Sequence, residues 1–428
     1  MTSTAKNRVD GPVHTFTRNV VAALGRDPRT RERDGGWDGA SPVVLHVCTR
    51  YQRGGSERRI RDAMRALPEF RHHLVVGADS DVALAREQTP AEQVWVLPTL
   101  VRRLDPVRDL RSLVGLWRLL RRGDHPVVVS HQSKAGVLTR AAAALGGPPA
   151  VHSLSMASFG PGYGRAENLV FRRLERLLGR RTAAFCVVGA DLAQRFAAVG
   201  VPGDRLHVVR SGVPLPAALP PRAEARRLLD ERFGTTPGRP VVVYVGSLEP
   251  RKNPLLLTAL LRRLHDQQAG RPQLLVVGDG PQRAALEAEL ASAGLAGDAV
   301  LTGHLTDPGA VHAAVRGADV LVLLSEAEGL PQVLVQAAAA GTPYVAFDVE
   351  GVREVLALGA RGSAVGLGDL DGVVAAVASW LSTRSADREP VADLSSWSPD
   401  AIASAYRAVL GRVVPVPASG VQHLSSVG

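Results

Sequence analysis

Short apolar runs alternate with longer helical patterns from Pro42 onward. The first runs are PVVLHVCT, HLVVGAD, QVWVLPTL and PVVVSH, and segments such as SERRIRDAMRAL and SKAGVLTRAAAAL lie between them. Because the runs are apolar throughout rather than alternating, they are typical of strands that are buried on both faces. Parallel strands need crossover connections, which helices on both faces of a sheet supply. The pattern therefore predicts an α/β fold with parallel sheets.

The strand and helix series is interrupted by a proline-rich stretch at 214–222, which predicts a stiff hinge. A chain of 428 residues is longer than one core usually supports. We therefore expect two doubly wound Rossmann-like domains facing a central cleft, where open α/β sheets bind their ligands. The expected boundaries are a disordered or loosely attached extension at 1–40, an N-terminal domain at 41–213, the hinge at 214–222, a C-terminal domain at 223–395, a helix at 396–412 that Ser398 caps, and a disordered tail at 413–428.

The bulk composition excludes several classes of protein. No apolar run approaches the roughly 20 residues of a membrane span, and residues 1–40 lack the apolar centre of a signal peptide, so we expect a cytoplasmic protein. Cys48 and Cys186 lie in apolar runs and are interpreted as core residues rather than as a disulfide or a zinc site. The net charge of +10 is spread along the chain without interleaved aromatic residues, so no nucleic-acid partner is expected.

A glycine-rich loop, RYQRGGSERR, follows the first expected strand. Gly54 and Gly55 would let a phosphate approach the backbone at the start of a helix whose expected N-cap is Ser56. A plain tight turn is an equally good interpretation. The related segment at Gly278 and Gly280 has Arg283 where a dinucleotide fingerprint needs a third glycine, which argues against a dehydrogenase.

Two cations follow the first strand of the second lobe, in GSLEPRKNP. Arg251 and Lys252 precede a helix that we expect Asn253 to cap and Pro254 to begin. Fixed cations beside a helix N-terminus stabilise the charge that a departing diphosphate gains in the transition state. The alternative is an ordinary solvated loop.

The segment SEAEGLPQVLVQAAAAGTP places Glu328 in a loop after a strand and Gln336 eight positions later on a helix. Helical side chains lean toward the helix N-terminus, so Gln336 is expected to face the cleft near Glu328. A carboxylate there can accept hydrogen bonds from two sugar hydroxyls. Spacing alone leaves open a loop charge and an ordinary helical glutamine.

These segments together resemble the family-4 glycosyltransferases (glycosyl transferases group 1), which are retaining enzymes of the GT-B fold. The resemblance covers about Pro42 to Val409. It rests on RGGSE, SHQSKAGVLTR, PPAVHSLS, GSLEPRKN, VVGDGPQR, LTGHL, SEAEGLPQVLVQAAAAGTP and VEGVREV in their usual order.

The resemblance implies that 41–213 is the acceptor-side domain, that 223–395 is the nucleotide-sugar-binding domain and that the helix at 396–412 crosses back to the N-terminal lobe. It also implies a role for particular residues of this chain. Arg251 and Lys252 would grip the diphosphate, Glu328 the transferred sugar and Gln336 the ribose. The implied donor-binding set also includes Gly54, Gly55, Ser247, Gly280, His304, Gly329, Leu330 and Pro331, and the implied acceptor-side set is Lys134, His152 and Ser155.

Three positions depart from the family pattern. Gln336 replaces the second of two glutamates spaced eight apart, Ser155 stands where many members have a histidine, and Ser247 stands where an arginine is frequent. An amide holds one ribose hydroxyl well and two poorly. We therefore hypothesise that a dTDP-sugar, whose deoxyribose has no 2′-hydroxyl, is accepted or preferred over a UDP-sugar.

The expected activity is retaining transfer of a sugar from a UDP- or dTDP-type donor to an acceptor hydroxyl or amine. No cofactor is expected beyond the donor, and no metal, because cations and helix dipoles can replace one. A sugar-nucleotide epimerase of the same fold and a non-catalytic sugar-nucleotide-binding homologue are the alternatives.

The acceptor is expected to be a small molecule, a glycan or a lipid-linked glycan. The helix expected over 105–122 combines arginines with an apolar set comprising Val107, Leu110, Leu113, Val114, Trp117 and Leu120. Burial of that set against a sheet is the favoured interpretation. Peripheral contact with an anionic membrane at the inner membrane face is the alternative, and the oligomeric state is open.

Overall fold

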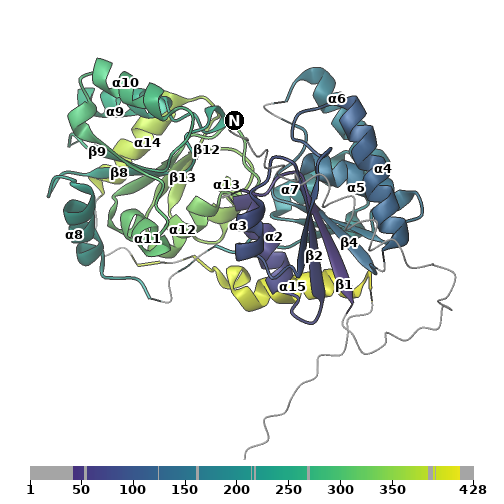
Figure 1. Cartoon of the computed structure of the whole chain (residues 1–428). Coiled ribbons are helices and arrows are strands. Elements are labelled where there is room, and N and C mark those ends of the chain that lie inside the picture. The colour runs from purple at the N-terminus through teal and green to yellow at the C-terminus, as the bar shows by residue number, and fades with distance from the viewer. Residues whose placement is uncertain are drawn as a thin grey trace, which may run out of the picture.

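The structure is a computed structural model. It describes residues 42–52, 55–123, 125–160, 163–213, 215, 218–267, 270–383, 389–390 and 392–414. The extension expected at 1–40, Gly54, and residues 415–428 of the expected tail lie outside these ranges. In Figure 1 the described residues form two α/β lobes side by side.

The N-terminal lobe is built on a parallel sheet whose described strands have the order β3-β2-β1-β4-β5-β6-β7. These strands are β1 Val43–Cys48, β2 Arg71–Gly77, β3 Gln93–Leu97, β4 Val127–His131, β5 Ala150–Leu154, β6 Ala184–Val187 and β7 Leu206–Val208. The helices that connect them are α2 Gly55–Arg65, α3 Val82–Gln88, α4 Pro106–Arg122, α5 Ser133–Ala144, α6 Arg165–Gly179 and α7 Ala190–Ala198.

The C-terminal lobe repeats this plan with a second parallel sheet, whose described strands have the order β10-β9-β8-β11-β12-β13. They are β8 Val241–Val245, β9 Gln273–Val277, β10 Ala299–Gly303, β11 Val320–Leu323, β12 Tyr344–Phe347 and β13 Gly362–Val365. The helices are α8 Arg222–Phe233, α9 Leu256–Asp266, α10 Arg283–Ser292, α11 Pro308–Gly317, α12 Gln332–Ala340, α13 Val352–Ala357 and α14 Leu370–Ser382. Two doubly wound lobes are the predicted fold class, which is confirmed.

Burial on both faces explains why the strands are apolar throughout. Along β1, Val44 belongs to the hydrophobic cluster on one face of the sheet, and Leu45 belongs to the cluster on the other face, under α4 and α5. A further cluster includes Phe185 and Phe196 of the first lobe together with Leu330 and Val352 of the second. The two lobes therefore share an apolar contact at the base of the cleft.

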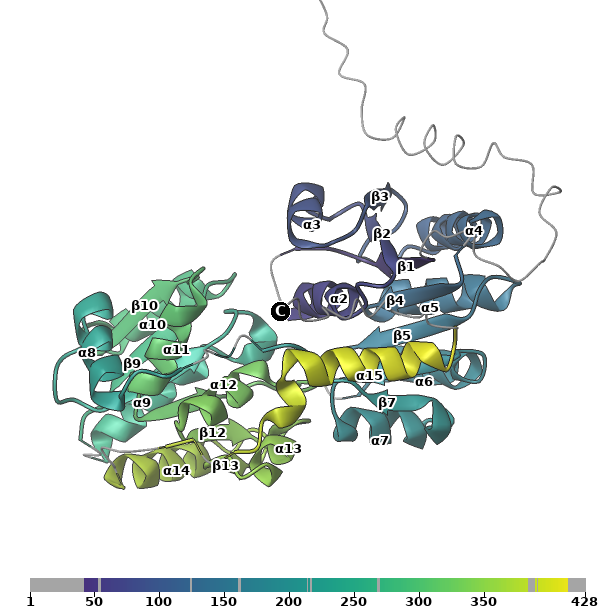
Figure 2. The same ribbon diagram turned by 90° about the horizontal axis from the view of Figure 1, so that it is seen from below.

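The C-terminal helix α15, Pro399–Gly411, returns to the N-terminal lobe as expected. The Ser398 side chain caps it by accepting a hydrogen bond from the amide of Ala401 at 3.2 Å. Ile402, Tyr406 and Val409 then pack with residues of β1, α2 and β6. Figure 2 shows α15 running from the C-terminal lobe along the underside of the N-terminal lobe.

Two expected helix starts are wrong. Helix α2 begins at Gly55, so Ser56 lies inside the helix rather than at its N-cap. Asn253 does not cap α9, because it adopts a left-handed backbone conformation after a short 3-10 turn at Pro250–Lys252, and α9 begins at Leu256. The Asn253 amide instead donates to the carbonyl of Leu324 at 3.1 Å. None of the helices in the described part of the chain is long and apolar enough to cross a bilayer.

Candidate active site

Two loops at the carboxyl edge of the second sheet form the centre of the site. The loop after β8 carries Arg251, and the loop after β11 carries Ala327 and Glu328. The amide of Glu326 donates to the Arg251 carbonyl at 3.0 Å, and the Arg251 guanidinium donates to the Ala327 carbonyl at 2.5 Å. These hydrogen bonds join two loops whose bonded residues are 75 and 76 positions apart in the sequence.

The structure brings Arg251, Lys252 and Glu328 together as the sequence led us to expect. The Lys252 ammonium forms an ion pair with Glu328, and the Arg251 guanidinium lies 3.8 Å from the same carboxylate. Glu328 is buried, whereas the Arg251 side chain is 36% exposed. The Arg251 guanidinium is therefore more accessible to an anion entering the cleft than the Glu328 carboxylate is.

The loops after β8 and β9 lie so close together that side chains are excluded between them. A Cβ atom on Gly278 would stand 1.9 Å from the Gly246 carbonyl oxygen, and one on Gly280 would stand 2.7 Å from the Leu248 amide nitrogen. Ser247 is exposed between these contacts, and its carbonyl accepts a hydrogen bond from the Tyr244 hydroxyl at 2.9 Å. The structure thus places Ser247 and Gly280 on the same sheet edge as Arg251.

His304 follows β10 at that edge and is exposed. Gln336 lies on α12, half-buried, one turn beyond Gln332 at the start of the helix. Gly55 begins α2 in the other lobe, and a Cβ atom there would lie 3.9 Å from Nε2 of the Gln332 side chain. The first residues of α2 and α12 therefore lie close together where the lobes meet, and helix N-termini favour an anion.

The segment Gly329, Leu330 and Pro331 forms part of the junction between the lobes. A Cβ atom on Gly329 would stand 1.9 Å from the carbonyl oxygen of Ser155, in the loop after β5. Leu330 and Pro331 are buried. Ser155 therefore lies at the cleft, against the loop that carries Glu328.

His152 differs from the expected acceptor-side position. It lies in β5 and is fully buried, with Gly136 of α5 against its ring. Its Nδ1 lies 2.9 Å from the Ser130 hydroxyl, and burial holds its pKa well below the usual value. The ring packs between the sheet and α5, so a substrate in the cleft does not reach it.

Lys134 also has an intramolecular partner. Its ammonium lies 2.5 Å from an Asp109 carboxylate oxygen and donates to the Arg103 carbonyl. Both partners belong to α4 and the loop before it. Lys134 therefore ties α5 to α4, and its side chain is only 12% exposed.

A second group of residues joins the lobes and was not assigned from the sequence. Glu354 of α13 accepts hydrogen bonds from the Ala190 amide at 3.0 Å and from the Arg210 guanidinium at 2.5 Å. The Asp191 carboxylate accepts one from the Gly351 amide at 3.0 Å, and Arg195 forms an ion pair with Glu350. The motif VEGVREV contains Glu350 and Glu354, but nothing in the sequence shows which arginines of the other lobe contact these carboxylates.

A cavity of about 290 Å³ lies beside Glu328 and includes residues of both lobes. Its acidic lining residues are Asp191, Glu326, Glu328, Asp348 and Glu350, and its basic ones are Arg195 and Arg353. Burial raises the pKa of Glu350 to about 7, and Asp191 adds to that rise while Arg195 opposes it. Among the described residues, no group of three or more His, Cys, Asp or Glu side chains is arranged to hold a metal ion.

Comparisons with known proteins match a glycosyltransferase family in each lobe. The family described as glycosyl transferases group 1 matches residues 226–393, and the glycosyl transferase 4-like domain matches residues 54–212. A GDP-mannose-dependent alpha-mannosyltransferase of Mycobacterium tuberculosis is 30% identical over 331 residues, which cover 74% of this chain and 78% of that protein.

Other curated relatives act on different substrates. An Escherichia coli galactosyltransferase that uses UDP-Gal and alpha-D-GlcNAc-diphosphoundecaprenol is 26% identical over 78% of this chain and 86% of its own length. A 2-deoxystreptamine glucosyltransferase of Streptomyces kanamyceticus is 35% identical over 45% of this chain and 49% of its own length.

Solved glycosyltransferase structures share the fold. The lipopolysaccharide outer core galactosyltransferase WaaB in its apo form matches with a TM-score of 0.65 at 17% identity, over 86% of this chain and 99% of that one. HepE of Anabaena in complex with UDP matches with a TM-score of 0.62 at 18% identity, over 87% of this chain and 96% of that one. On the evidence of both lobes, this chain belongs to the family-4, group 1 glycosyltransferases of the GT-B fold and is a glycosyltransferase that uses nucleotide sugars.

Proposed function

We propose that this enzyme transfers a sugar from a UDP- or dTDP-sugar to an acceptor hydroxyl or amine, with retention of configuration and without a metal ion. The observation that carries the proposal is the contact of Lys252 and Arg251 with Glu328 at the mouth of the cleft. Two cations and one carboxylate are the groups that a sugar diphosphate requires.

The three side chains have different tasks in this proposal. Arg251 and Lys252 hold the diphosphate and stabilise the charge that it gains as its bond to the sugar breaks. Entry of the diphosphate draws Lys252 away from Glu328, which frees the carboxylate to accept hydrogen bonds from sugar hydroxyls. Charge-assisted hydrogen bonds of this kind contribute about 1.5–3 kcal/mol each.

The neighbouring N-termini of α2 and α12 support diphosphate binding between the lobes. Their amides and dipoles favour an anion. Because Gly55 has no side chain, a ligand can approach the backbone at the start of α2. With Arg251 and Lys252 these groups can offset the diphosphate charge. We therefore propose that no divalent cation is needed.

Retention follows if the acceptor attacks on the face from which the diphosphate leaves, with a phosphate oxygen taking the acceptor proton. This route needs no protein nucleophile. The relatives act on acceptors as different as a lipid-linked diphosphate and 2-deoxystreptamine, and both supply hydroxyl groups. We propose an acceptor drawn from small molecules, glycans or lipid-linked glycans, bound where Ser155 borders the cleft.

Slow hydrolysis of the donor tests the proposal without knowledge of the acceptor. We expect the enzyme to release UDP or dTDP from a panel of nucleotide sugars, with unchanged rates in EDTA, and to release sugar that retains the donor's anomeric configuration in NMR spectra recorded before mutarotation. Loss of activity in EDTA would refute metal independence, and inverted sugar would refute retention. Binding of nucleotide sugars without any release would instead identify a non-catalytic binder.

A further inference from the structure

The outward faces of α4 and α6 carry an unusual set of exposed aliphatic side chains. In the described part of the chain, nine large hydrophobic side chains are exposed, and seven of these lie on α4 or just before it, on α6, or directly after α5. These seven are Leu104, Val107, Leu110, Leu145, Leu169, Val170 and Leu177. Water-facing aliphatic side chains grouped in this way mark an interaction surface.

The packing of α4 explains why some of its apolar residues face outward. Its buried residues are Ser112, Leu116 and Leu120, which are spaced four apart and form one stripe. At about 100° per residue, Val107 lies half a turn round the helix from Leu116. Burial of the whole apolar set against the sheet, our favoured interpretation of the sequence, is therefore wrong for Val107 and Leu110, which are 59% and 61% exposed.

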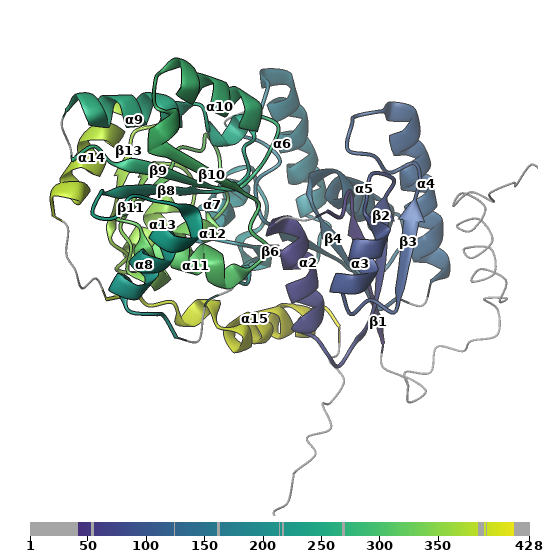
Figure 3. The same ribbon diagram turned by 60° about the vertical axis from the view of Figure 1, so that its left-hand side comes forward.

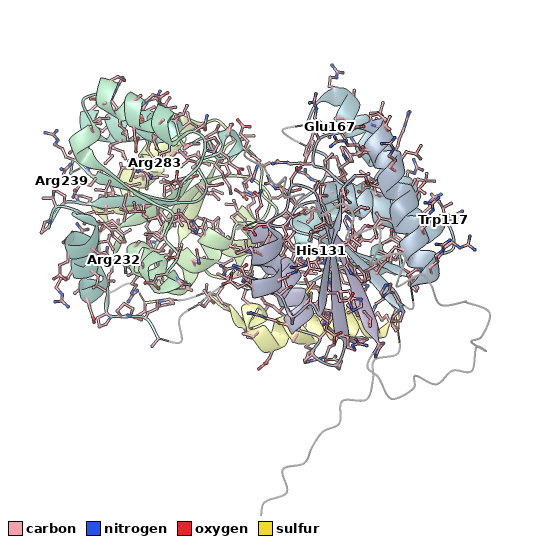
Figure 4. All side chains as sticks on the ribbon, viewed as in Figure 1. Trp117, His131, Glu167, Arg232, Arg239 and Arg283 are labelled. Carbon is pink, nitrogen blue, oxygen red and sulfur yellow. The ribbon has the colours of Figure 1, made fainter. Side chains whose placement is uncertain are left out.

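Helices α4 and α6 lie on the same face of the N-terminal sheet. Both pack against α5, which lies between them. Figures 2 and 3 show this order from two directions, with α4 and α6 forming ridges on either side of α5. Figure 4 places Trp117 of α4 and Glu167 of α6 on this flank of the molecule.

Helix α6 adds a dense positive charge to this face. A groove of about 620 Å³ along it is lined by Arg165, Arg172, Arg173 and Arg176. None of these four guanidinium groups forms an ion pair or a hydrogen bond with another described residue. Glu175 is buried in a pair with Arg140, which leaves Glu167 as the exposed acidic residue of α6.

The start of α4 also combines exposed arginines with exposed aliphatic side chains. Arg102, Arg103, Arg108 and Arg111 are exposed beside Leu104, Val107 and Leu110. Asp109 is neutralised by Lys134, and Asp105 by Arg108 at 3.5 Å. Among the described residues, Arg102, Arg103 and Arg111 form no ion pair, so exposed aliphatic residues and unpaired arginines occur together on both ridges.

We propose that the outward faces of α4 and α6 dock this enzyme on an anionic phospholipid bilayer. The guanidinium groups bind lipid phosphates, and the leucine and valine side chains enter the boundary between headgroups and acyl chains. Nucleic acid is a poorer fit, because single strands need exposed aromatic rings for stacking and these ridges present aliphatic groups. The inference does not depend on the donor or on the chemistry of the transfer reaction.

Flotation of the purified full-length protein with liposomes tests the proposal. We expect binding to vesicles of phosphatidylcholine with 30% phosphatidylglycerol, weak binding to phosphatidylcholine alone, and weaker binding to the anionic vesicles as salt is raised. Absence of binding to the anionic vesicles would overturn the proposal. Retention on an immobilised acidic polypeptide without vesicle binding would overturn it as well and would assign the face to an acidic protein.

Two variants separate the contributions of charge and of apolar insertion. Arg172→Ser/Arg173→Ser/Arg176→Ser is expected to lower the partition coefficient on the order of 100-fold. Leu169→Ser/Val170→Ser/Leu177→Ser is expected to lower it by at least tenfold and to leave the salt dependence in place. All six side chains are exposed, so unchanged circular dichroism spectra are expected.

A matched control removes arginines from another surface. Arg227 and Arg232 are exposed on α8, and Figure 4 shows Arg232 on the opposite flank of the molecule. Arg227→Ser/Arg232→Ser should bind anionic vesicles within about threefold of the wild type, since these residues lie far from the proposed contact. Equal losses in the control and in the α6 arginine variant would show a general effect of net charge and would overturn the proposed docking face.

Discussion

Gly329 lies against Ser155 across the cleft, with no room for a side chain between them. A Cβ atom at position 329 would stand 1.9 Å from the Ser155 carbonyl oxygen and 2.8 Å from its carbonyl carbon. Because the obstacle is backbone, it cannot swing aside as a flexible side chain would. The contact therefore sets how closely the loop that carries Glu328 approaches the N-terminal lobe.

Gly329→Ala is expected to displace this loop and to reduce donor hydrolysis at least tenfold, because small displacements of positioned groups have large kinetic effects. Hydrolysis rates measure the effect. Gly297→Ala is the control, since a Cβ atom there meets nothing within 4 Å. Equal activity in Gly329→Ala and wild type would show that the closed contact is not needed for catalysis.

Glu328→Gln is expected to lower donor hydrolysis about 100-fold while the protein still binds the nucleotide diphosphate. The amide of glutamine cannot accept two charge-assisted hydrogen bonds from a sugar. Loss of the carboxylate also leaves Lys252 without its partner in the ion pair. Rates of donor hydrolysis measure the loss of catalysis, and thermal shifts with UDP measure whether the nucleotide diphosphate still binds. Glu326→Gln, an exposed neighbour in the same loop, should retain activity within a few-fold, and equal losses in both variants would contradict a special role for Glu328.

Gln336→Glu tests the hypothesis about the nucleoside. A carboxylate at this half-buried position can hold both ribose hydroxyls of uridine, so we expect the ratio of activities with UDP- and dTDP-sugars to rise about tenfold in favour of UDP. Competition between the two donors measures the ratio directly. An unchanged ratio would remove Gln336 as a determinant of the nucleoside.

Glu354→Gln is expected to weaken the junction of the lobes by about 2 kcal/mol, because it leaves Arg210 without its carboxylate in a largely buried setting. Limited proteolysis and thermal unfolding report the loss. Asp371→Asn removes the exposed pair with Arg263 and should change stability by less than about 1 kcal/mol. If both variants unfold alike, Glu354 does not hold the lobes together.

A chain of buried histidines predicts acid sensitivity. His72 Nε2 donates to the Leu67 carbonyl at 3.0 Å, so its Nδ1 accepts from His46 Nε2, and His46 Nδ1 accepts from His131 Nε2, both at 3.1 Å. Protonation of His72 or His46 would set two N–H groups against each other, and a second proton on His131 would place a charge in a fully buried site near Arg59. Burial lowers the pKa of all three rings, that of His131 to about 3, and Figure 4 shows His131 within the N-terminal lobe.

Since these pKa values are lower in the folded state than in the unfolded one, the stabilisation is complete above about pH 6.5 and is lost as the pH falls toward 3. For His131 alone the loss at pH 5 is about 2 kcal/mol. Urea unfolding at pH 7.5 and 5.0 measures it. His131→Gln should flatten the pH dependence, whereas substitution of the exposed His304 by glutamine should leave it unchanged; a wild type equally stable at both pH values would contradict the prediction.

The sequence alone determined the two-lobe fold and most of the donor-site loops. Continuous Val- and Leu-rich runs separated by helices allow little besides parallel sheets. The order of the loop motifs resembles a known family, and that resemblance implied that Arg251, Lys252 and Glu328 bind parts of the same donor. These are local or topological consequences of the chain, which is why periodicity and motif order carry them.

Tertiary packing decided the rest. The burial of His152 depends on Gly136 of a helix that crosses above it, the exposure of Val107 and Leu110 depends on which stripe of α4 meets the sheet, and the Glu354 contacts depend on how the lobes dock. Each involves partners from different elements or lobes. A sequence states which groups are available, but only the folded arrangement decides which of them lose contact with water and which remain free to bind.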